Sequence, residues 1–571
     1  MIEVHADPHS MRLEVRAPSR LADIIARIPG LKVDARAGCW AGAITPQLML
    51  AVANDLGKMD GFAPTPEADS LMSSIQAVRS AVASVKRDGT GHDDPRLYDY
   101  QAVGVWMLLN RKRVLLGDEM GTGKTVMSLT AARECRGATL VVCPNSMKHR
   151  WADEAAVWYP EARSFVLHGT AKQKQALIDE ATEAWKDGTP ILVIVNWESL
   201  RTLSRVAGYG SQKLTEKEKE AGPLNGFKWE TVIADEAHKA KDPNSKQTRA
   251  LWAVAQGAEY RWALTGTPVL NTPGDLWAIG RFYDPATFGE SRHKWHNSYV
   301  AFIETNWGPK DIGLRQDRKA LFEAWFDMNF IRRTKDEVLD LPPVTYQTRT
   351  VELHQKQRTA YNRMVQDMIV AIDEGVLVAT DPLALLTRLS QIASATPVID
   401  EHGDVIALDT PSNKVAALFE VLDELGEDRP VAVFAQSRKL IELAASELER
   451  KGISTAMVTG AVDPSLREGN VQRFQRGDAR VALVTLGAGA EGINLYAADT
   501  AVFLQRTYSY GQSLQAEARI HRIGQEADRV TIIDLVSEGT VDEAVIEALR
   551  SKGEMSEQVL RDQTRSLLRK V

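Results

Sequence analysis

The sequence predicts an α/β protein with two parallel-sheet lobes in tandem, a helical segment between them and a small α+β domain in front. Two observations lead to this prediction. Short apolar runs rich in β-branched residues alternate with helical patterns in residues 95–275, and the same alternation returns in residues 411–550. Such alternation is typical of βαβ units, in which a helix crosses between two parallel strands. With 571 residues, the chain can form about four folding units of roughly 150 residues each.

The first ~90 residues read as a separate unit. Residues 11–16 alternate apolar and polar side chains like a half-buried strand, and apolar residues at helical spacing follow in residues 21–28. Thr45 and Pro46 are a typical N-cap and first position of a second helix. The polar, Gly- and Asp-rich residues 86–95 read as a linker.

Apolar runs mark the strands that we expect in each lobe. In the first lobe they are residues 114–116, 140–143, 191–195, 232–234 and 262–264. In the second lobe they are residues 431–434, 456–458, 481–484, 501–504 and 530–533. The segment between the lobes, residues 276–410, is rich in Trp, Phe and charged residues and reads mostly as helix. Residues 551–571 read as a helical basic flank, and residues 213–220 as a solvated loop or exposed helix.

The composition is that of an ordinary globular protein, with 44% hydrophobic and 25% charged residues. Lys and Arg number 69, and Asp and Glu number 76, so the formal net charge is −7. This balance argues against a uniformly basic nucleic-acid-binding protein, and contact with nucleic acid would have to use local basic strips. The longest apolar runs, such as residues 191–195, are far shorter than the ~20 residues of a membrane-spanning helix.

Cysteine usage and the N-terminal residues favour a soluble protein of a reducing compartment. Cys39, Cys135 and Cys143 follow no Cys-x-x-Cys or disulfide-like spacing, so we expect no disulfide framework and no structural metal. The first residues lack the charged and apolar parts of a signal peptide. We therefore expect a cytoplasmic or nucleoid-associated protein, and the compact length favours a bacterial or viral source.

A phosphate-binding loop lies between an expected strand and an expected helix. In the run LGDEMGTGKT, Asp118 stands where the strict G-x-x-x-x-G-K-[ST] pattern has its first glycine. Gly121 and Gly123 let backbone N–H groups approach phosphate oxygens, and the helix N-terminus adds a favourable dipole. We expect Lys124 to reach the β- and γ-phosphates and Thr125 to ligate Mg²⁺. The alternative is an ordinary glycine-rich turn.

Two carboxylates follow another expected strand. The run VIADEAH places Asp235 and Glu236 at the carboxyl end of that strand, which is the edge where open α/β sheets bind ligands. Asp235 can hold a metal ion, and Glu236 can orient and deprotonate an attacking water. His238 either relays between sites or caps a loop.

An arginine pair lies near the C-terminus in the run QAEARIHRIGQ. On a helix, Gln515, Arg519 and Arg522 would share one face by i, i+4 and i+3 spacing. Two guanidinium groups that reach across a cleft can neutralise charge on a transferring γ-phosphoryl group. A surface helix with ordinary ion pairs is the alternative, and the phosphate-binding loop in the other lobe favours the catalytic interpretation.

Together these motifs resemble the SNF2-type branch of the superfamily 2 helicase-like ATPases, over roughly residues 95–550. The motifs that carry the resemblance are LYDYQ at 97–101, DEMGTGKT at 118–125, CPNS at 143–146, LTGTP at 264–268, FIRRTKDEV at 330–338 and GAEGIN at 489–494. The resemblance implies two RecA-like lobes with helical protrusions between them. It also implies ATP and Mg²⁺ as cofactors and double-stranded DNA as the partner.

The resemblance assigns roles to individual residues. Gln101 would contact the adenine base. Catalysis would use Lys124, Glu236, Arg519 and Arg522, and Mg²⁺ would be held by Thr125 and Asp235. Further nucleotide contacts would come from Gly121, Thr122, Gly123, Gly492 and Gln515. The DNA backbone would be contacted by Ser146, Lys148, Arg150 and Thr267.

Some positions depart from the family pattern. Glu491 puts an acid into a glycine-rich motif, and residues 505–511 lack the usual Trp-Asn-Pro. Both departures lie where nucleotide binding and DNA binding are expected to couple. The N-terminal unit resembles, more faintly, the small module that precedes the motor in annealing-helicase-like members, through the Ile28-Pro-Gly30 helix end and Trp40. Trp40 reads as a core residue rather than a base-stacking platform.

The sequence therefore predicts an ATP-driven motor that moves on double-stranded DNA or remodels DNA or protein–DNA complexes, in replication, recombination or repair. Two other functions stay open. One is a strand-separating helicase, which could act on RNA, and the other is a nucleotide-gated DNA-binding scaffold that hydrolyses little ATP. Chromatin remodelling is the least favoured option, since no histone-reading appendage is recognisable in the sequence.

Overall fold

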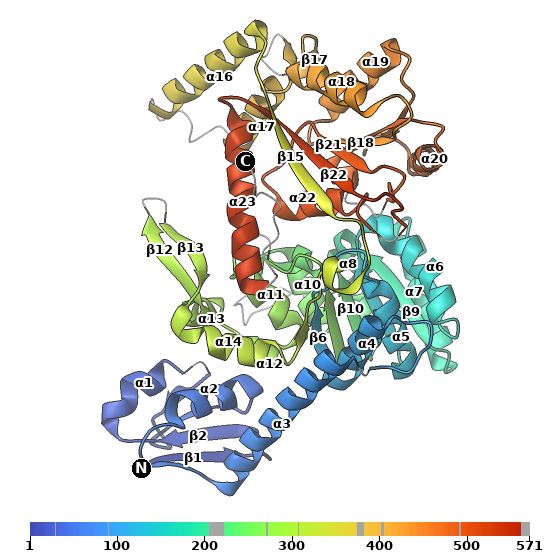
Figure 1. Cartoon of the computed structure of the whole chain (residues 1–571). Coiled ribbons are helices and arrows are strands. Elements are labelled where there is room, and N and C mark those ends of the chain that lie inside the picture. The colour runs from blue at the N-terminus through green and yellow to red at the C-terminus, as the bar shows by residue number, and fades with distance from the viewer. Residues whose placement is uncertain are drawn as a thin grey trace. The chain divides into compact units, whose positions relative to one another are not determined.

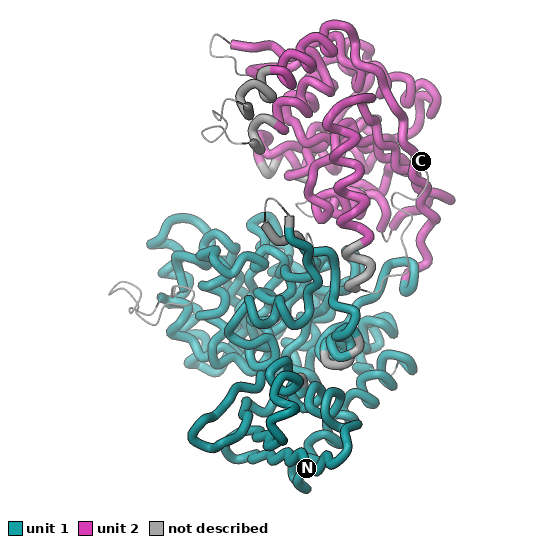
Figure 2. Tube along the Cα trace, turned by 90° about the vertical axis from the view of Figure 1, so that its left-hand side faces the viewer, with its two compact units in different colours: residues 1–338, 558–560 teal, residues 339–557, 561–571 magenta. Residues whose placement is uncertain are grey.

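The computed structural model describes residues 1–28, 30–89, 91–204, 222–269, 272–305, 308–373, 382–400, 405–489, 493–522 and 524–560. The chain forms two compact units, essentially Met1–Val338 and Leu339–Glu557 (Figure 2). Five short 3₁₀ helices occur in the described part of the first unit: η1 (Ser19–Leu21), η2 (Asn145–Met147), η3 (Pro223–Gly226), η4 (Ala237–Ala240) and η5 (Gln316–Arg318).

The first unit opens with the predicted α+β domain. Its five strands pair in the order β3-β4-β2-β1-β5, and only the β1–β5 pair is parallel. The strands are β1 (Ile2–Asp7), β2 (Arg12–Arg16), β3 (Lys32–Asp34), β4 (Cys39–Ala43) and β5 (Phe62–Pro64), and the helices are α1 (Ala22–Ala26), α2 (Pro46–Leu56) and α3 (Pro66–Asp88). Thr45 caps α2 as predicted, since its Oγ1 accepts a hydrogen bond from the Leu48 N–H at 3.1 Å. The linker prediction for residues 86–95 was wrong at its start, because α3 continues to Asp88 and ends at Gly89 with φ +68°.

The first lobe is a seven-stranded sheet of parallel strands in the order β14-β6-β11-β10-β7-β9-β8 (Figure 1). Its strands are β6 (Arg113–Leu116), β7 (Thr139–Cys143), β8 (Arg163–Val166), β9 (Ile191–Asn196), β10 (Thr231–Asp235), β11 (Tyr260–Leu264) and β14 (Phe330–Ile331). Its helices are α4 (Asp99–Arg111), α5 (Lys124–Cys135), α6 (Lys148–Trp158), α7 (Ala171–Lys186), α8 (Trp197–Leu203), α10 (Lys246–Val254) and α11 (Asp275–Tyr283). The five predicted strands are confirmed. They are almost wholly buried, as expected for a parallel sheet covered on both faces.

A smaller subdomain follows between α11 and β14. It contains α12 (Pro285–Phe288), α13 (Arg292–Tyr299), the hairpin strands β12 (Val300–Thr305) and β13 (Gly308–Leu314), and α14 (Lys319–Phe326); α15 (Lys335–Val338) comes after β14. Stacked rings of Phe322, Phe326 and Phe330 form part of its core. The N-terminal domain packs on this subdomain through the ion pair of Arg318 with Asp55, at 2.6 Å, with both side chains 13% exposed.

The second unit contains a six-stranded sheet of parallel strands in the order β15-β22-β21-β18-β20-β19. Its strands are β15 (Val344–Val351), β18 (Val431–Ala435), β19 (Thr455–Val458), β20 (Val481–Thr485), β21 (Thr500–Phe503) and β22 (Val530–Ser537), and a separate hairpin is formed by β16 (Thr396–Ile399) and β17 (Val405–Asp409). Its helices are α16 (Gln355–Asp373), α17 (Pro382–Ile392), α18 (Asn413–Leu425), α19 (Arg438–Arg450), α20 (Pro464–Gln475), α21 (Leu486–Gly489), α22 (Tyr510–Glu517) and α23 (Val541–Leu560). All five strands predicted for this lobe are confirmed.

The segment between the lobes differs from its prediction as mostly helix. Helices do dominate residues 276–410, but the segment also contains two hairpins, β12–β13 and β16–β17. In addition, it supplies strand β14 to the first sheet and strand β15 to the second. Because β15 pairs with β22 over eight residue pairs, the sheet of the second lobe begins well before residue 411. Residues 213–220, and residues 561–571 of the C-terminal flank, lie outside the described residues.

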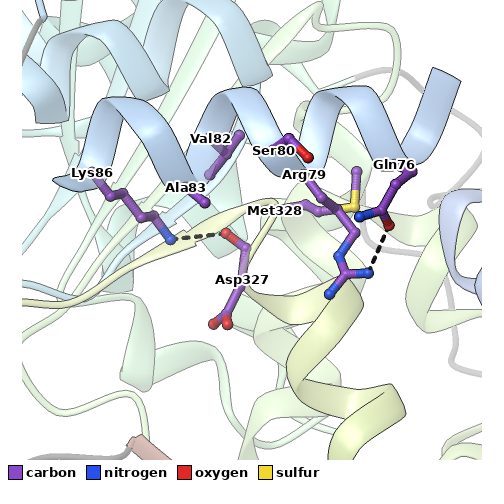
Figure 3. Close-up of a pocket in the computed structure, with 8 residues that line it drawn as sticks. All are labelled: Gln76, Arg79, Ser80, Val82, Ala83, Lys86, Asp327 and Met328. Atoms are coloured by element: carbon purple, nitrogen blue, oxygen red, sulfur yellow. Dashed lines mark hydrogen bonds between the residues drawn. The ribbon is translucent and has the colours of Figure 1, made fainter. Parts of the chain in front are cut away.

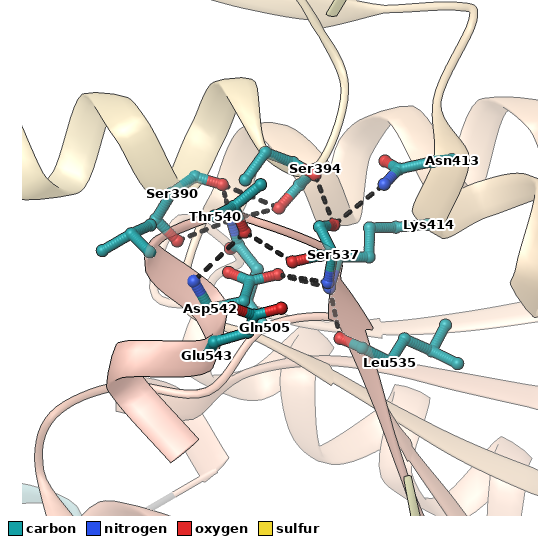
Figure 4. A network of polar contacts seen from close by, with 12 residues as sticks. Ser390, Ser394, Asn413, Lys414, Gln505, Leu535, Ser537, Thr540, Asp542 and Glu543 are labelled. Carbon is teal, nitrogen blue, oxygen red and sulfur yellow. Dashed lines mark hydrogen bonds and ion pairs between the residues drawn. The ribbon is translucent and has the colours of Figure 1, made fainter. Parts of the chain in front are cut away.

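A buried polar network ties α17, α18 and the start of α23 to the second sheet (Figure 4). Lys414 is 0% exposed, and its ammonium group lies 2.6 Å from the Asp542 carboxylate and also donates to the Leu535 carbonyl. Asn413 donates to the Ser537 hydroxyl at 2.8 Å, and that hydroxyl donates to the Ala393 carbonyl at 2.7 Å. Ala393, which precedes the predicted start of this lobe at residue 411, is thus hydrogen-bonded to the sheet of the lobe. No helix in the described part of the chain is long and apolar enough to cross a membrane.

Candidate nucleotide site

The phosphate-binding loop connects β6 to the N-terminus of α5, as predicted. Gly121 and Gly123 have φ values of +85° and +83°, a region that side chains disfavour. Gly123 is also the N-cap of α5, and a Cβ atom there would collide with the side-chain amide of Gln101. The dihedral angle therefore favours glycine, and any side chain here would also have to displace the Gln101 amide. Thr125, the second residue of α5, is partly exposed.

Lys124 lies over the first half of the same loop. Its ammonium group donates to the main-chain carbonyls of Asp118, at 2.7 Å, and Glu119, at 2.9 Å. Burial lowers the pKa of Lys124, while the charges of Glu236, Asp118 and Asp235 act in the opposite direction. The lysine therefore interacts electrostatically with carboxylates of both predicted motifs.

Gln101 joins the entry motif to the phosphate-binding loop. Its side-chain oxygen accepts from the Tyr98 N–H at 3.1 Å, and its amide donates to the Thr122 carbonyl at 3.1 Å. The Tyr100 hydroxyl donates to that same carbonyl at 2.9 Å. The structure thus brings together Gln101, Thr122 and Gly123, three residues that the sequence assigned to one nucleotide.

The acidic strand end lies at the carboxyl edge of the sheet, where β11 alone separates β10 from β6. The Asp235 carboxylate accepts from the Trp151 indole N–H at 2.9 Å and from the Glu236 N–H at 3.0 Å. The Trp197 indole donates to the Asp235 main-chain carbonyl at 3.0 Å. Burial, together with the nearby Glu236 carboxylate, raises the pKa of Asp235 to about 6. Sequence reasoning missed the two indole donors, because nothing in their spacing connects them with Asp235.

His238 connects Glu236 with the LTGTP motif. Its Nδ1 lies 3.2 Å from the Glu236 Oε2 and 3.0 Å from the Thr265 hydroxyl. Glu236 itself has φ +51°, an unusual conformation for a residue other than glycine. The relay and loop-capping interpretations of His238 both stay open.

The arginine pair is placed differently from the prediction. Helix α22 ends at Glu517, so Arg519 and Arg522 lie in the turns after it and do not continue the face of Gln515. Two hydrogen bonds and one buried side chain fix the conformation of these turns. The Leu495 N–H donates to the Arg519 carbonyl at 2.9 Å, Arg522 donates to the Asn494 side chain, and Ile520 is fully buried. Gln515 is buried, whereas both arginines are partly exposed. Gly492 lies outside the described residues.

Two of the four residues predicted to contact DNA are buried in this structure. Lys148 is buried, and its ammonium group donates to the Leu167 carbonyl at 2.9 Å, so it is part of the lobe's interior. Thr267 is 2% exposed, which removes its hydroxyl from the surface. Ser146 is exposed, and Arg150 is partly exposed at 3.8 Å from Glu154, so both stay candidates.

Comparison with known proteins places this site in a family. The profile described as "SNF2-related domain" matches residues 100–398, and that described as "Helicase conserved C-terminal domain" matches residues 413–524. The first match alone covers more than half of the chain. The chain belongs to the SNF2 family. As an SNF2-family protein it is an ATP-hydrolysing enzyme, which confirms the predicted family and enzyme class.

The SNF2-family chain is similar to several much longer curated proteins. Chromodomain-helicase-DNA-binding protein 8 of Xenopus tropicalis is 27% identical over 502 residues, covering 81% of this chain and 22% of that protein. Chromodomain-helicase-DNA-binding protein 1-like of Danio rerio is 27% identical over 492 residues, covering 83% and 44%. Transcription regulatory protein SNF2 of Saccharomyces cerevisiae is 27% identical over 500 residues, covering 81% and 28%. The chain therefore spans less than half the length of these relatives.

Among solved structures, the SWI2/SNF2 ATPase core of Sulfolobus solfataricus in complex with double-stranded DNA is similar to the SNF2-family chain. The identity is 22% and the TM-score 0.36, covering 84% of this chain and 97% of that one. The parallel sheets of the two units, rather than this likeness, establish the α/β fold class.

Proposed function

We propose that the protein is an ATP-dependent double-stranded DNA translocase, which moves on or remodels DNA or protein–DNA complexes in replication, recombination or repair. The observation that carries this proposal is the convergence on Lys124, at one sheet edge, of the phosphate-binding loop and the carboxylates of Asp235 and Glu236. A site of this kind can couple nucleotide hydrolysis to movement.

The residues at this edge fit Mg²⁺ as the partner of ATP. Mg²⁺ prefers oxygen ligands, and it is commonly held by one or two carboxylates together with substrate phosphates and water. The described residues contain no group of three or more His, Cys, Asp or Glu side chains that could hold a metal by themselves. We therefore assign the ion to Asp235 and Thr125, where it would neutralise charge on the phosphates.

Each catalytic side chain has a distinct task in this proposal. Lys124 exchanges the carbonyls of Asp118 and Glu119 for phosphate oxygens, and Glu236 orients and deprotonates the attacking water. Arg519 and Arg522 of the second lobe neutralise charge that builds up on the γ-phosphoryl group. Closure of the lobes around ATP, and their opening after hydrolysis, would then shift their grips on DNA.

Double-stranded DNA is the proposed track. Several relatives are DNA-binding proteins by name, and the Sulfolobus core was solved with double-stranded DNA. Contacts to phosphates position a protein without reading sequence, so binding should be sequence-tolerant and steeply salt-dependent. Ser146 and Arg150 are the exposed candidates in the first lobe.

A second candidate is the remodelling of chromatin. It is favoured by the names of two similar proteins, Protein CHROMATIN REMODELING 5 of Arabidopsis thaliana and ISWI chromatin-remodeling complex ATPase ISW1 of Saccharomyces cerevisiae. Since the chain covers less than half of those proteins, their activity on chromatin does not transfer with the ATPase region. Nucleosome sliding compared with translocation on bare DNA would separate the two functions.

The test is ATP turnover with and without duplex DNA, together with displacement of a third strand from a triplex. The Lys124→Ala and Glu236→Gln variants should lose both DNA-stimulated turnover and displacement. Lys186→Ala and Glu183→Gln are matched controls, since this exposed pair lies on α7, which packs on β8 and β9 at the edge remote from β6. Full biological activity of both site variants would favour a scaffold, and unwinding of forks without triplex displacement would favour a strand-separating helicase.

A further inference from the structure

We propose that residues 329–335, here called the support segment, set the shape of the phosphate-binding loop and that Arg333 is a positioning residue for nucleotide binding and hydrolysis. The sequence singled out part of this segment as a family motif but assigned it no task. The proposal rests on the ATP site and is independent of movement on DNA.

The main chain of the support segment continues the sheet into the loop. The Leu115, Gly117 and Glu119 N–H groups donate to the carbonyls of residues 329, 331 and 333, at 2.8, 2.8 and 3.0 Å. The first of these bonds lies beside β6 and the last lies beyond the end of that strand. The first half of the phosphate-binding loop is therefore held as an extension of a parallel β-ladder.

The Arg333 guanidinium pairs with the Asp118 carboxylate. Its Nε lies 3.0 Å from the Asp118 Oδ1, and its Nη2 donates to the other oxygen of the same carboxylate. Arg333 also donates to the Tyr100 carbonyl, and its guanidinium lies 5.2 Å from the centre of the Tyr100 ring. The Asp118 side chain is 0% exposed and that of Arg333 is 14% exposed. A carboxylate buried to this degree requires a cation, and a planar guanidinium fixes its orientation as well as its charge.

Arg332 and Lys335 add three further hydrogen bonds. The Arg332 Nη1 donates to the Gly117 carbonyl at 2.6 Å and to the Gly266 carbonyl at 2.8 Å. It thereby joins the start of the phosphate-binding loop to the LTGTP motif. The Lys335 N–H donates to the Glu119 carboxylate at 2.8 Å.

These contacts act on Lys124 through two residues. Asp118 and Glu119 are held by the support segment, and their carbonyls are the acceptors of the Lys124 ammonium group. A shift of Asp118 would therefore shift the lysine that is to meet the phosphates. Misplacement of a reactive group by about 1 Å can cost ~100-fold in rate.

The chain around the support segment is also held by Arg111 and Lys86, which lie outside the phosphate-binding loop. Arg111 donates to the Met328 carbonyl at 3.0 Å and to the Asn329 side chain at 3.2 Å. Lys86, at the end of α3, donates to the Asp327 carbonyl at 2.9 Å and to the Phe330 carbonyl at 2.7 Å; Figure 3 shows its contact with Asp327. Arg111→Gln and Lys86→Met therefore loosen the same stretch of chain without removing a partner of Asp118, which makes them matched controls.

The experiment measures ATP turnover and the binding of a fluorescent ADP analogue in the full chain without DNA. Arg333→Gln should lower kcat/KM for ATP by about 10- to 100-fold, the range seen when a supporting partner of an active-site group is removed. Arg333→Lys should fall between this variant and the wild type, because it keeps the charge but loses the two-pronged contact. Both controls should stay within about threefold of the wild type.

A double-variant cycle separates positioning from general loss of stability. If Arg333 acts through Asp118, the Asp118→Asn/Arg333→Gln chain should be no worse than the worse single variant, because the shared contact is lost only once. Equal losses in Arg333→Gln and Arg111→Gln, or additive losses in the cycle, would overturn the assignment of Arg333 as a positioning residue. Arg333→Lys and Asp118→Asn keep the test decisive if Arg333→Gln does not fold. A wild-type chain that hydrolyses no ATP either with or without duplex DNA would instead contradict the ATPase assignment.

Discussion

Gly123 shows how closely the nucleotide site constrains single residues. Its φ of +83° strains any side chain, and a Cβ atom would meet the Gln101 amide. We expect Gly123→Ala to lower affinity for ADP and ATP by at least tenfold, because the loop and Gln101 would both have to move. Gly188→Ala is the control, since Gly188 has φ +81° but open space around its Cα. Titration of a fluorescent nucleotide compares the two, and equal affinities would contradict the expectation.

The cysteines provide a second test at this scale. Burial raises the pKa of Cys135 to about 12 and raises the pKa of Cys143 further above its ordinary value. Only the thiolate reacts with disulfide reagents, so at pH 8 about one Cys135 in 10⁴ is reactive at equilibrium. A colorimetric disulfide reagent should therefore modify neither thiol rapidly in the folded chain. In guanidinium chloride all three cysteines should react, and rapid modification of Cys143 in the native protein would contradict its burial.

The same pKa shifts fix the direction of the pH dependence. A pKa that is raised in the folded state means that folding favours the neutral thiol. The two thiols therefore lower the free energy of unfolding only when the pH rises above their unfolded pKa of ~8.5, where the unfolded chain loses these protons first. Reactivity in the folded chain should accordingly stay low as the pH rises from 7 to 9. Parallel measurements on the unfolded chain should show the normal rise.

At the scale of elements, the buried pair of Lys414 and Asp542 is the contact that we expect to matter most for the second unit. Removing one partner of a buried ion pair leaves an uncompensated charge and costs about 3–5 kcal/mol. Lys414→Met should therefore lower the unfolding transition of this unit strongly, whereas Lys414→Met/Asp542→Asn should recover part of the loss. Calorimetry or denaturant titration measures the effect.

The control for this pair lies on α19. Arg438 and Glu442 form an exposed i, i+4 ion pair at 3.2 Å, and such pairs contribute about 0–1 kcal/mol. Arg438→Gln should hardly change the transition. An equal effect of Arg438→Gln and Lys414→Met would show that burial of the charge is not the cause.

Strand prediction succeeded for the strands buried on both faces and, among the edge strands of the two large sheets, found β19 but missed β8, β14 and β15. The predicted runs of β9 and β20 are continuous apolar segments, which is typical of central parallel strands. The missed strand β8 is at one edge of the first sheet and has an exposed Arg163, and β15 at the edge of the second sheet has no fully buried residue. The missed edge strands are stabilised largely by hydrogen bonds from one neighbouring strand, and these bonds are not visible in the local pattern of apolar residues.

At the scale of the whole molecule, ATP hydrolysis is proposed to require both lobes. Arginines that neutralise a transferring phosphoryl group can contribute ~10³–10⁵ in rate. We therefore expect Arg519→Ala or Arg522→Ala to lower kcat by at least ~100-fold. Nucleotide affinity should change only a few-fold, because most of the proposed nucleotide contacts lie in the first lobe. Rapid-quench turnover and nucleotide titration measure the two quantities.

The control for this prediction is an arginine of the second lobe that lies outside the QAEARIHRIGQ motif. Arg450 is 69% exposed and pairs with Glu447 at the end of α19. Arg450→Ala should leave kcat unchanged. Normal turnover in the Arg519→Ala/Arg522→Ala double variant would refute the two-lobed catalytic mechanism.

The function of the N-terminal domain also belongs to the scale of the whole molecule. The family profiles begin at residue 100, so the resemblance of this domain to the module of annealing-helicase-like members stays a prediction. The structure connects the domain with the first lobe through the Arg318–Asp55 ion pair and through Lys86. A role of this domain in sensing DNA structure stays a prediction, which ATP turnover on forked and four-way DNA would test.

The sequence by itself determined the fold class, the phosphate-binding loop, the acidic strand end and the family, because these depend on short contiguous patterns of glycine, charge and apolar residues. Only the tertiary structure decided which side chains support them. Arg333 meets Asp118 across more than 200 residues of chain, Trp151 meets Asp235, and Lys148 turns inward to the Leu167 carbonyl. Contacts of this kind arise when sheet pairing brings distant segments side by side, and no local spacing encodes them.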